Sequence, residues 1–398
     1  MKIGIVSNLY PPLSRGGAEL IAGRISDDLY GRGHEIFVLT STPFSGLSSL
    51  RAEQVTERHT EMIYRFFPLN LYHTLSDGNV PFAVRAPWHL IDMYAPFSRY
   101  AMARLIRREQ PDVLLTHNVK GLGLQLIRAI RASGIKHIHT VHDVQLSVPS
   151  GLLIRGKEDA GLNRGLLRKS YERQVQDIFG SPDVVISPSA FLADFYRDRG
   201  FFPASNLQVI PNPAPQIEVG KRPKRLNGTL RILFAGQLED HKGIPFLLEA
   251  LNGLDMDFRL HIAGEGALSS YVTEWSNRDR RVVYHGFVSL EHLFQLFDIA
   301  DVVVVPSLCY ENSPTVIYEA FQAGLPVIAS DIGGVGELVK EGQNGLLFEP
   351  GNTDAFLQAI HRFGSERERF EEAASSIREE AKKYSLRRYV DRLEDLMK

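Results

Sequence analysis

Short apolar runs alternate with longer helical stretches along most of this chain, and this alternation limits its fold more than any other feature. The runs are nearly continuous in valine, isoleucine and leucine, which is typical of strands buried on both faces of a parallel sheet. In the first half they read KIGIVSN, EIFVLT, DVLLTHN, KHIHTVHD, PDVVISPS and LQVIPNP. The pattern predicts an α/β fold in which helices cover a parallel sheet.

The alternation is interrupted once and then starts again. Between Phe66 and Ser98, prolines and aromatic residues replace the periodic pattern, which predicts an insertion with little regular structure. The stretch from Pro215 to Gly228 is polar, basic and rich in proline and glycine, so it is the best candidate for a linker. After it the strand pattern resumes in LRILFAG, FRLHIAG, RVVYHG, DVVVVPS, LPVIASD and GLLFEP.

Two domains are expected, because a chain of 398 residues exceeds what one hydrophobic core usually serves. We place an N-terminal Rossmann-like domain at residues 1–215, the linker at 216–228 and a C-terminal Rossmann-like domain at 229–379. Ligands of open parallel sheets bind at the carboxyl ends of the strands. If the two domains face each other, the cleft between them is the expected site.

The C-terminal stretch has the spacing of an amphipathic helix. Its apolar residues form one stripe, and such a helix needs a partner surface. The stripe consists of Leu386, Tyr389, Leu393 and Leu396. We therefore expect a helix at about 380–398 to pack back on the first domain.

The remaining composition favours a cytoplasmic protein. The start, MKIGIVSNLY, lacks the length and cleavage pattern of a secretory signal, and no run approaches the length of a membrane span. The single cysteine, Cys309, cannot form an internal disulfide. Basic residues exceed acidic ones before the linker, which leaves open a peripheral contact with a membrane or an acidic acceptor, beside the alternative of scattered surface charge. No nucleic-acid partner is expected.

The stretch ENSPTVIYE, directly after the run DVVVVPS, predicts the start of a helix at a strand end. Ser313 as the N-cap and Pro314 as the first helical residue are a favoured pair. The amides of Thr315 and Val316 would then point toward the strand ends, where the helix dipole favours an anion such as phosphate.

Two carboxylates flank this helix start. Glu311 precedes the cap and Glu319 lies on the second turn. Carboxylates accept hydrogen bonds from hydroxyls, so the pair suits a ligand with hydroxyls on both sides of its phosphates, as a nucleotide sugar has. The alternative is that Ser-Pro merely begins a helix and both acids face solvent.

Two further glycine-containing stretches fit an anion site. In LFAGQLEDHKG, Gly236 ends a strand and Lys242 stands just before a helix, where it can reach the same anion or simply decorate the surface. In LYPPLSRGGAE, Gly16 and Gly17 would let backbone amides approach a phosphate. Neither stretch is the G-x-G-x-x-G fingerprint, so a nicotinamide cofactor is not favoured.

Three histidines lie in HIHTVHD. His137 and His139 share one face of a strand, so a metal site is conceivable, but no further ligands are evident. His142 stands at the strand's carboxyl end and is the one placed to meet a substrate. No metal and no bound cofactor are expected.

Several of these motifs together resemble one known family. From about Lys2 to Pro350 the chain is similar to the retaining glycosyltransferases of family 4, which have the GT-B fold, and the second half carries the more specific part of the likeness. The shared motifs are RGGAE, TVHD, VISPS, VIPNP, GQLEDHKG, HIAGEG, HGFVS and ENSPTVIYEAFQAGLPVIASDIGG. The resemblance implies transfer of a sugar from a nucleotide diphosphate to an acceptor hydroxyl, with retention of configuration and no obligatory metal.

The resemblance also implies roles for individual residues of the second domain. Glu319 would hold the ribose, Glu311 would contact hydroxyls of the transferred sugar beneath the reacting carbon, and Lys242 would bind the diphosphate. The base would lie against the backbone of Phe287 and Val288.

In the first domain the resemblance implies that His142 touches the donor sugar near the acceptor. The glycine pair of the family falls on Gly16 and Gly17. Gly236 is expected at the diphosphate, but the family's arginine after that glycine is replaced here by Gln237, which brings no charge. Either Lys242 and the helix dipole suffice, or an arginine such as Arg15 completes the site.

Three functions stay open on these grounds. The first is a glycosyltransferase of polysaccharide, glycolipid or glycoconjugate synthesis that uses a UDP-, GDP- or ADP-linked sugar and a sugar, lipid-linked or small-molecule acceptor. The second is a hydrolase or epimerase of the same fold. The third is a scaffold with a degenerate sugar site, which the substitution by Gln237 favours.

Overall fold

The computed structural model describes residues 1–14, 16–52, 54–58, 61–160, 165–215 and 228–398. Its contacts divide the chain into two compact units. Unit 1 comprises Met1–Leu152, Asp159–Asn212 and Leu386–Lys398, and unit 2 comprises Leu153–Glu158 and Pro213–Ser385. The chain passes from one unit to the other after residues 152, 158, 212 and 385. Most of the expected linker lies outside the described residues.

Unit 1 is built on an eight-stranded sheet in the order β3-β4-β2-β1-β5-β6-β7-β8, in which only β3 runs antiparallel. The predicted parallel sheet is confirmed, but β3 and β4 were missed, because the QVTER run has a single apolar residue and charged residues interrupt EMIYRF. The strands are β1 (Lys2–Val6), β2 (Glu35–Ser41), β3 (Gln54–Arg58), β4 (Glu61–Phe66), β5 (Val113–Thr116), β6 (Lys136–Thr140), β7 (Val184–Ser187) and β8 (Asn206–Val209).

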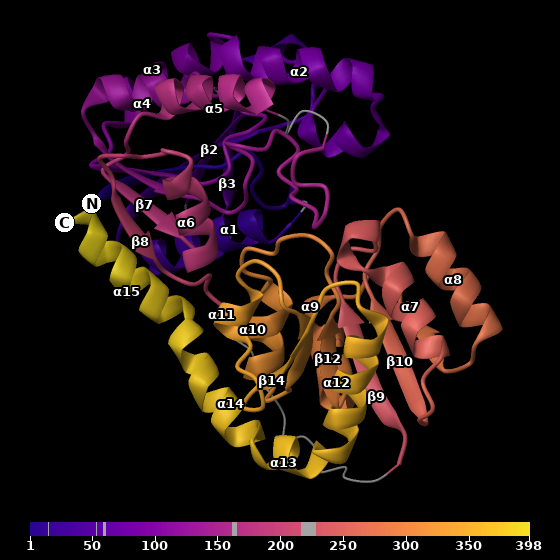
Figure 1. The fold of residues 1–398 in the computed structure, drawn as a ribbon. Coiled ribbons are helices and arrows are strands. Elements are labelled where there is room, and N and C mark those ends of the chain that lie inside the picture. Colours follow the sequence, from indigo (N-terminus) through magenta and orange to yellow (C-terminus); the bar gives the residue numbers. More distant parts are fainter. Residues whose placement is uncertain (15, 53, 59–60, 161–164, 216–227) are drawn as a thin grey trace. The chain divides into compact units, whose positions relative to one another are not determined.

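Helices flank this sheet, and α2 and α3 form the outer layer along one side of the unit (Figure 1). The α-helices of the unit are α1 (Gly17–Gly31), α2 (Phe82–Tyr94), α3 (Phe97–Glu109), α4 (Leu126–Ser133), α5 (Gly165–Phe179), α6 (Ala190–Asp198) and α15 (Leu386–Met397). Short 3₁₀ turns are η1 (Leu47–Leu50) and η2 (Thr74–Asn79).

The prediction of little regular structure between residues 66 and 98 was wrong, because α2 forms there despite a proline inside it. Tertiary contacts outweigh that proline. The indole of Trp88 is buried and donates to the carbonyl of Tyr72 (2.8 Å). The Asp92 carboxylate accepts from the backbone N–H of Gly121 at 2.9 and 3.0 Å.

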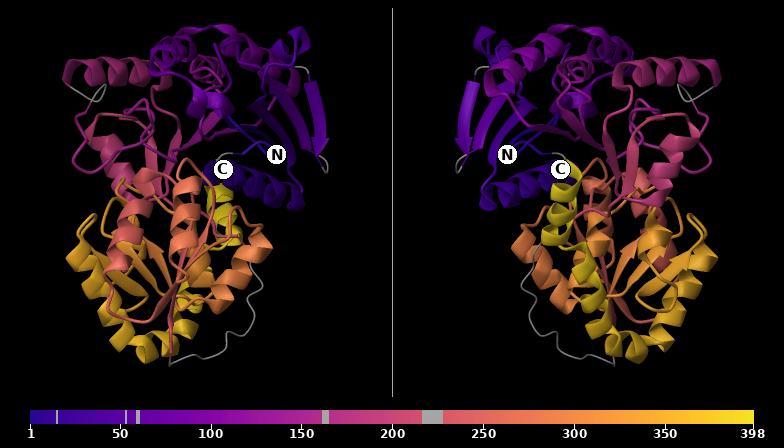
Figure 2. Two further views of the ribbon diagram at one scale, coloured as in Figure 1. Left: turned by 90° about the vertical axis from the view of Figure 1, so that its right-hand side faces the viewer. Right: turned by 90° about the vertical axis from the view of Figure 1, so that its left-hand side faces the viewer.

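The C-terminal helix α15 belongs to unit 1 and packs on α1, and both termini lie on one side of that unit (Figures 1 and 2). Its residues Tyr389, Val390 and Leu393 are buried in the same core cluster as β1 and α1. At its outer edge the Arg32 guanidinium contacts the carboxylates of Asp391 (2.6 Å) and Glu394 (2.8 Å).

Several titratable side chains of unit 1 are buried and shifted. Burial lowers the pKa values of His73, His117 and His137 to about 4. Burial also raises the pKa values of Asp92 and Asp143 to about 6, although hydrogen bonds to each carboxylate oppose the shift. The imidazoles of these three histidines are therefore neutral at neutral pH.

Unit 2 contains a six-stranded, all-parallel sheet in the order β11-β10-β9-β12-β13-β14. Helices cover both of its faces (Figure 2). The strands are β9 (Leu230–Ala235), β10 (Phe258–Ala263), β11 (Val282–Tyr284), β12 (Val302–Val305), β13 (Val327–Ser330) and β14 (Gly345–Phe348). The second predicted parallel sheet is confirmed, and each strand falls within its predicted apolar run.

Two core clusters hold the helices of unit 2 on its sheet, one cluster on each face. After Glu366 the chain forms several short helices. The elements are η4 (Asp240–Lys242), α7 (Ile244–Asn252), α8 (Ser269–Arg278), α9 (Leu290–Ile299), α10 (Thr315–Gln322), α11 (Val335–Leu338), α12 (Thr353–Ser365), α13 (Arg367–Glu372), α14 (Ala374–Ala381) and η5 (Lys382–Tyr384). In the described residues no helix is long and apolar enough to cross a membrane.

Candidate active site

The strand order of unit 2 reverses between β9 and β12. From β9 the chain first builds outward through β10 and β11, and it then returns to place β12 on the other side of β9. Such a reversal opens a crevice at the carboxyl ends of the two strands, where ligands of open α/β sheets bind. The loops that follow β9 and β12 hold most of the predicted site residues.

Lys242 is brought to the end of β12 by a close backbone approach. The next residue, Gly243, has φ of +77°, and a Cβ atom there would clash with the carbonyl oxygen of Pro306. Only glycine fits this position without strain. The turn η4 therefore places the Lys242 side chain beside the loop that carries Glu311.

Lys242 and Glu311 form a largely buried ion pair. The ammonium Nζ donates to Oε1 of Glu311 at 2.6 Å, and the hydroxyl of Ser307 donates to the same oxygen at 2.6 Å. Burial alone would raise the pKa of Glu311 and lower that of Lys242. In each case the opposite charge of the partner outweighs burial. The pKa of Glu311 is accordingly below its usual value and that of Lys242 above it. Both groups are charged at neutral pH, and the ammonium has further N–H donors to offer.

The backbone of Glu311 is fixed by the turn that follows β13. The N–H of Gly334 donates to the carbonyl of Glu311 at 2.7 Å. Gly333 has φ of +65°, and a Cβ atom there would also clash with the Glu311 backbone. The DIGG stretch, residues 331–334, thus holds the Glu311 loop against the sheet edge.

Helix α10 begins one residue later than predicted. Its N-cap is Pro314, so Ser313 is not the cap and Pro314 is not the first helical residue. The hydroxyl of Ser313 instead lies 2.5 Å from that of Tyr318. The prolyl ring has no N–H to satisfy at the cap, and the serine turns to a neighbour on the next turn.

The first turn of α10 still stands at the end of β12. Thr315 and Val316 occupy it, and the first amides of a helix have no acceptor within the helix. Glu319 follows on the second turn and is 8% exposed, so it does not face solvent. Glu311 and Glu319 therefore lie before and within the same helix, as the sequence predicts.

The other predicted donor contacts lie along the same edge of the sheet. Gly236 directly follows β9, and Gln237 comes next with an exposed side chain. Phe287 and Val288 come after β11 in the loop before α9, and Phe287 is 76% exposed. An aromatic side chain with that exposure is available for stacking on a planar ligand.

A segment from the first half of the sequence joins this edge of unit 2. Residues Leu153–Glu158 pair with the strand-like stretch before Glu311 through an antiparallel bridge between Ile154 and Cys309. The N–H of Arg155 donates to the carbonyl of Leu308 (3.1 Å), and that of Tyr310 donates to the carbonyl of Leu153 (2.9 Å).

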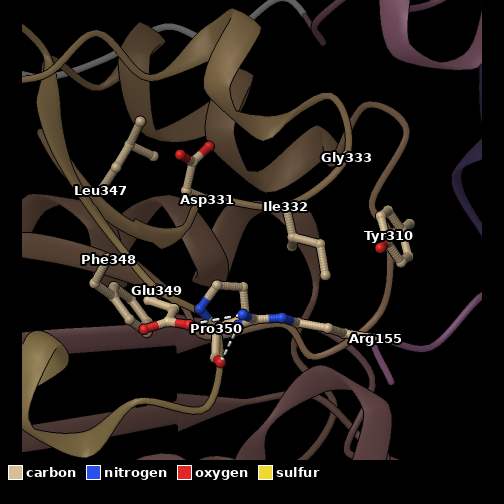
Figure 3. Close-up of a pocket in the computed structure, with 9 residues that line it drawn as sticks. All are labelled: Arg155, Tyr310, Asp331, Ile332, Gly333, Leu347, Phe348, Glu349 and Pro350. Atoms are coloured by element: carbon tan, nitrogen blue, oxygen red, sulfur yellow. Dashed lines mark hydrogen bonds and ion pairs between the residues drawn. The ribbon is translucent and has the colours of Figure 1, made fainter. Parts of the chain in front are cut away.

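Arg155 secures the segment through its side chain (Figure 3). Its guanidinium contacts the Glu349 carboxylate and the carbonyl of Pro350, each at 2.7 Å. The Tyr310 hydroxyl donates to Glu158 at 3.0 Å. A cavity of about 390 Å³ lies between Arg155, Tyr310 and the DIGG turn.

The predicted residues of unit 1 occupy two places in that unit. Gly16 is the N-cap of α1, which begins at Gly17, and the N–H of Gly16 donates to the Glu19 carboxylate at 2.9 Å. His142 lies 2.9 Å from His117, ring nitrogen to ring nitrogen, and burial lowers the pKa of His142 well below its usual value. Arg15 lies outside the described residues.

The histidines considered for a metal have other partners. The Thr116 hydroxyl lies 2.7 Å from a ring nitrogen of His137 and 2.8 Å from one of His139, and both imidazoles are buried. Within the described part of the chain, no group of three or more histidine, cysteine or acidic side chains could hold a metal ion.

Sequence reasoning assigned no role to three parts of this site. Ser307 directly follows the predicted strand, so its position after an apolar run was an available signal. The DIGG turn also follows a predicted strand and repeats the glycine signal of a close approach. Arg155 had no local signal, because its contacts are with residues far away in the sequence.

Comparison with known proteins matches both halves of the chain. The family described as Glycosyltransferase Family 4 matches residues 15–215, and the one described as Glycosyl transferases group 1 matches residues 229–365. An uncharacterized glycosyltransferase of Methanocaldococcus jannaschii is 25% identical over 382 residues, which cover 91% of this chain and 88% of that protein. Glycogen synthase of Mycobacterium tuberculosis is 26% identical over 378 residues, which cover 90% of this chain and 85% of that protein.

A solved structure shares the fold over the whole chain. Anabaena HepE in complex with UDP superimposes with a TM-score of 0.70 at 18% identity, and the match covers 99% of both chains. The predicted fold class, a GT-B architecture of two Rossmann-like domains, is confirmed.

Proposed function

Because this chain belongs to glycosyltransferase family 4, we propose that it moves a sugar from a nucleotide diphosphate to an acceptor hydroxyl with retention of the anomeric configuration. One contact carries this proposal: the Lys242–Glu311 pair beside the first turn of α10, where the strand order of unit 2 reverses. A cation and helix amides suit a pyrophosphate there, and the neighbouring carboxylates suit sugar hydroxyls.

The chemistry requires stabilisation of a leaving group. The bond between the anomeric carbon and the phosphate oxygen breaks, the acceptor oxygen bonds to that carbon, and the acceptor proton passes to the departing diphosphate. Negative charge grows on the diphosphate as its bond breaks. Lys242 and the amides of Thr315 and Val316 would donate to that charge, and donors held in place by the fold lower the barrier without reorganising.

The two acids and the exposed aromatic residue would contact the remaining parts of the donor. Glu311 would accept hydrogen bonds from hydroxyls of the transferred sugar, and Glu319 would hold the ribose. Phe287 and Val288 would lie against the base. Gly236 and Gln237 would approach the diphosphate, with Gln237 donating hydrogen bonds where the family commonly has a cation. The proposed reaction needs no metal.

In unit 1 the proposal assigns positioning roles. His142 is held by His117 and is neutral at neutral pH, so it would orient the donor sugar through a hydrogen bond and not act as a charged group. Gly16 and Gly17 keep their proposed place at the donor, where the Gly16 N–H would exchange the Glu19 carboxylate for a ligand oxygen.

A UDP-linked sugar is the first donor to test, since the similar HepE was solved with UDP. A glycan acceptor is proposed because the relatives include a glycogen synthase. Thermal unfolding should be followed with UDP-, GDP- and ADP-sugars in turn. A donor at about 100 times its Kd stabilises the fold by about 2.7 kcal/mol, which only the correct base should approach.

Product analysis separates the proposal from its alternatives. With the stabilising donor and acceptor extracts, NMR should show a new glycoside whose anomeric configuration is that of the donor. Free sugar or an epimerised nucleotide sugar without acceptor would indicate a hydrolase or epimerase. Donor binding with no turnover over hours would indicate the degenerate scaffold that Gln237 favours.

A further inference from the structure

The outward face of α2 is apolar. Ala83, Pro87, Leu90 and Tyr94 recur every three or four residues, so they share one side of the helix, and all are exposed. Leu90 is 58% exposed and Tyr94 is 52% exposed. On the other side of α2, Trp88 and Asp92 are buried in unit 1. An exposed apolar stripe on a helix that is already packed by its other side marks a surface for a partner.

The next helix, α3, presents the complementary chemistry. Arg99, Tyr100, Arg104, Arg107 and Arg108 are its exposed large side chains, and Tyr100 is 70% exposed. In the described parts of α2 and α3 no carboxylate is exposed, because Asp92 is bonded to Gly121 and the buried Glu109 pairs with Lys2 at 2.9 Å and with Arg108 at 3.3 Å. The exposed charge of these helices is therefore uniformly positive.

Figure 1 shows α2 and α3 following one another along the outer side of unit 1. We propose that this α2–α3 surface, formed by the apolar stripe of α2 and the arginines of α3, docks on an anionic lipid bilayer. The stripe would enter the boundary between headgroups and acyl chains, where tyrosine is also favoured. The arginines would remain at the level of the lipid phosphates.

A bilayer fits this surface better than a second copy of the chain. In a symmetric dimer the same patch would meet itself, so the arginines of both copies would be gathered in one interface with no exposed carboxylate among the described residues of α2 or α3 to pair with. A purely polyanionic partner would leave the apolar stripe uncovered. The cytoplasmic location expected from the sequence would bring the chain to a leaflet with a negative surface potential. Bilayer docking does not depend on the proposed reaction. It would determine where in the cell that reaction occurs.

Vesicle sedimentation with the full-length protein tests the inference. Vesicles of phosphatidylcholine alone should bind weakly, and vesicles with a third of phosphatidylglycerol should bind strongly and lose binding as salt rises. Arg104→Gln with Arg107→Gln should weaken binding about 25-fold, at about fivefold for each charge. Leu90→Asn with Tyr94→Asn should weaken it at least tenfold.

Two control variants are matched by exposure and lie in unit 2. Arg278→Gln and Leu290→Asn, both of exposed residues, should leave vesicle binding unchanged. All variants should unfold at the temperature of the unaltered protein, since each changed side chain is exposed. No donor or acceptor is present, so a failure of the proposed reaction would not affect the result.

Equal binding to neutral and anionic vesicles would overturn the inference, as would unchanged binding by the α2 or α3 variants. Sedimentation velocity without lipid provides a further outcome. A dimer that dissociates on Leu90→Asn with Tyr94→Asn would assign the surface to a second copy and would likewise refute bilayer docking.

Discussion

Arg155 should matter for turnover although it lies outside the predicted donor site. Its guanidinium holds the Leu153–Glu158 segment to Glu349 and Pro350, and that segment pairs with Cys309, two residues before Glu311. We expect Arg155→Ala to loosen the segment and, through it, the loop that positions the Glu311 carboxylate. Arg155 is therefore predicted to be a positioning residue.

The size of the effect follows from the two interactions that the substitution removes. The Arg155–Glu349 pair is about half exposed, with 42% and 56% of the side chains accessible, so solvent screens it and it contributes little. The bond to the Pro350 carbonyl contributes about 1 kcal/mol, the usual net value of a hydrogen bond. A loss of about 1 kcal/mol raises the detached population about fivefold. Misplacement of a reacting group can cost up to about 10²-fold in rate, so a tenfold loss of kcat is expected.

Two assays separate positioning from damage to the fold. Hydrogen exchange at the Tyr310 amide, which donates to Leu153, should quicken about fivefold in Arg155→Ala. Calorimetry should show unchanged affinity for the free nucleotide, because Glu319 and the first turn of α10 remain in place. The double variant Arg155→Glu with Glu349→Arg should recover part of kcat by restoring the ion pair in reverse.

Arg278→Ala is the matched control, since Arg278 also forms an exposed pair in unit 2, with Glu274. The reasoning fails if the two alanine variants have the same kcat. It also fails if exchange at the Tyr310 amide does not change.

Four other outcomes are expected. Lys242→Ala should lower turnover roughly 10²- to 10³-fold by removing a donor to the developing anion, and single-turnover rates equal to those of the unaltered protein would exclude that role. Glu319→Ala should weaken free-nucleotide binding by about 1.5 to 3 kcal/mol, and calorimetry showing unaltered affinity would contradict the ribose contact. Unit 1 should lose stability on acidification from about pH 6.5 to 4, because its buried histidines stay neutral while the unfolded chain binds protons. The two buried carboxyls with pKa values of about 6 oppose this loss but are outnumbered by the histidines, so urea titrations with an unchanged midpoint across that range would refute the assignment. Turnover should survive EDTA, and its loss with recovery on adding Mg²⁺ would contradict a metal-independent reaction.

The sequence predicted the features that depend on local pattern. Continuous apolar runs identified the parallel strands of both sheets except β4, since burial on both faces selects those residues. Strand β3 escaped notice because its run is polar. Helix α2 was missed because Pro87 signals a break, whereas burial of Trp88 and the bonds of Asp92 outweigh that signal.

Within the site, too, local features were predictable from the sequence and long-range contacts were not. The loop after β12 and the turn before α7 were recognisable because glycine, proline and charged residues stand at strand ends. The contact of Lys242 with Glu311 was not predictable in this form, since each was expected to face a ligand. Its cause is long-range, because the approach of Gly243 to Pro306 joins loops that are distant in sequence. Arg155 shows the same limit.

Because the chain passes repeatedly between its two units, no single cut separates it into two complete domains. A fragment starting at residue 228 would contain the second sheet but would leave Cys309 without the short β partner supplied by Ile154. A fragment stopping at residue 212 would leave bare the apolar patch that Val390 and Leu393 cover. Swapping one lobe between homologues would therefore require transplanting several separate pieces of coding sequence, and a single crossover in the linker would yield two incomplete halves.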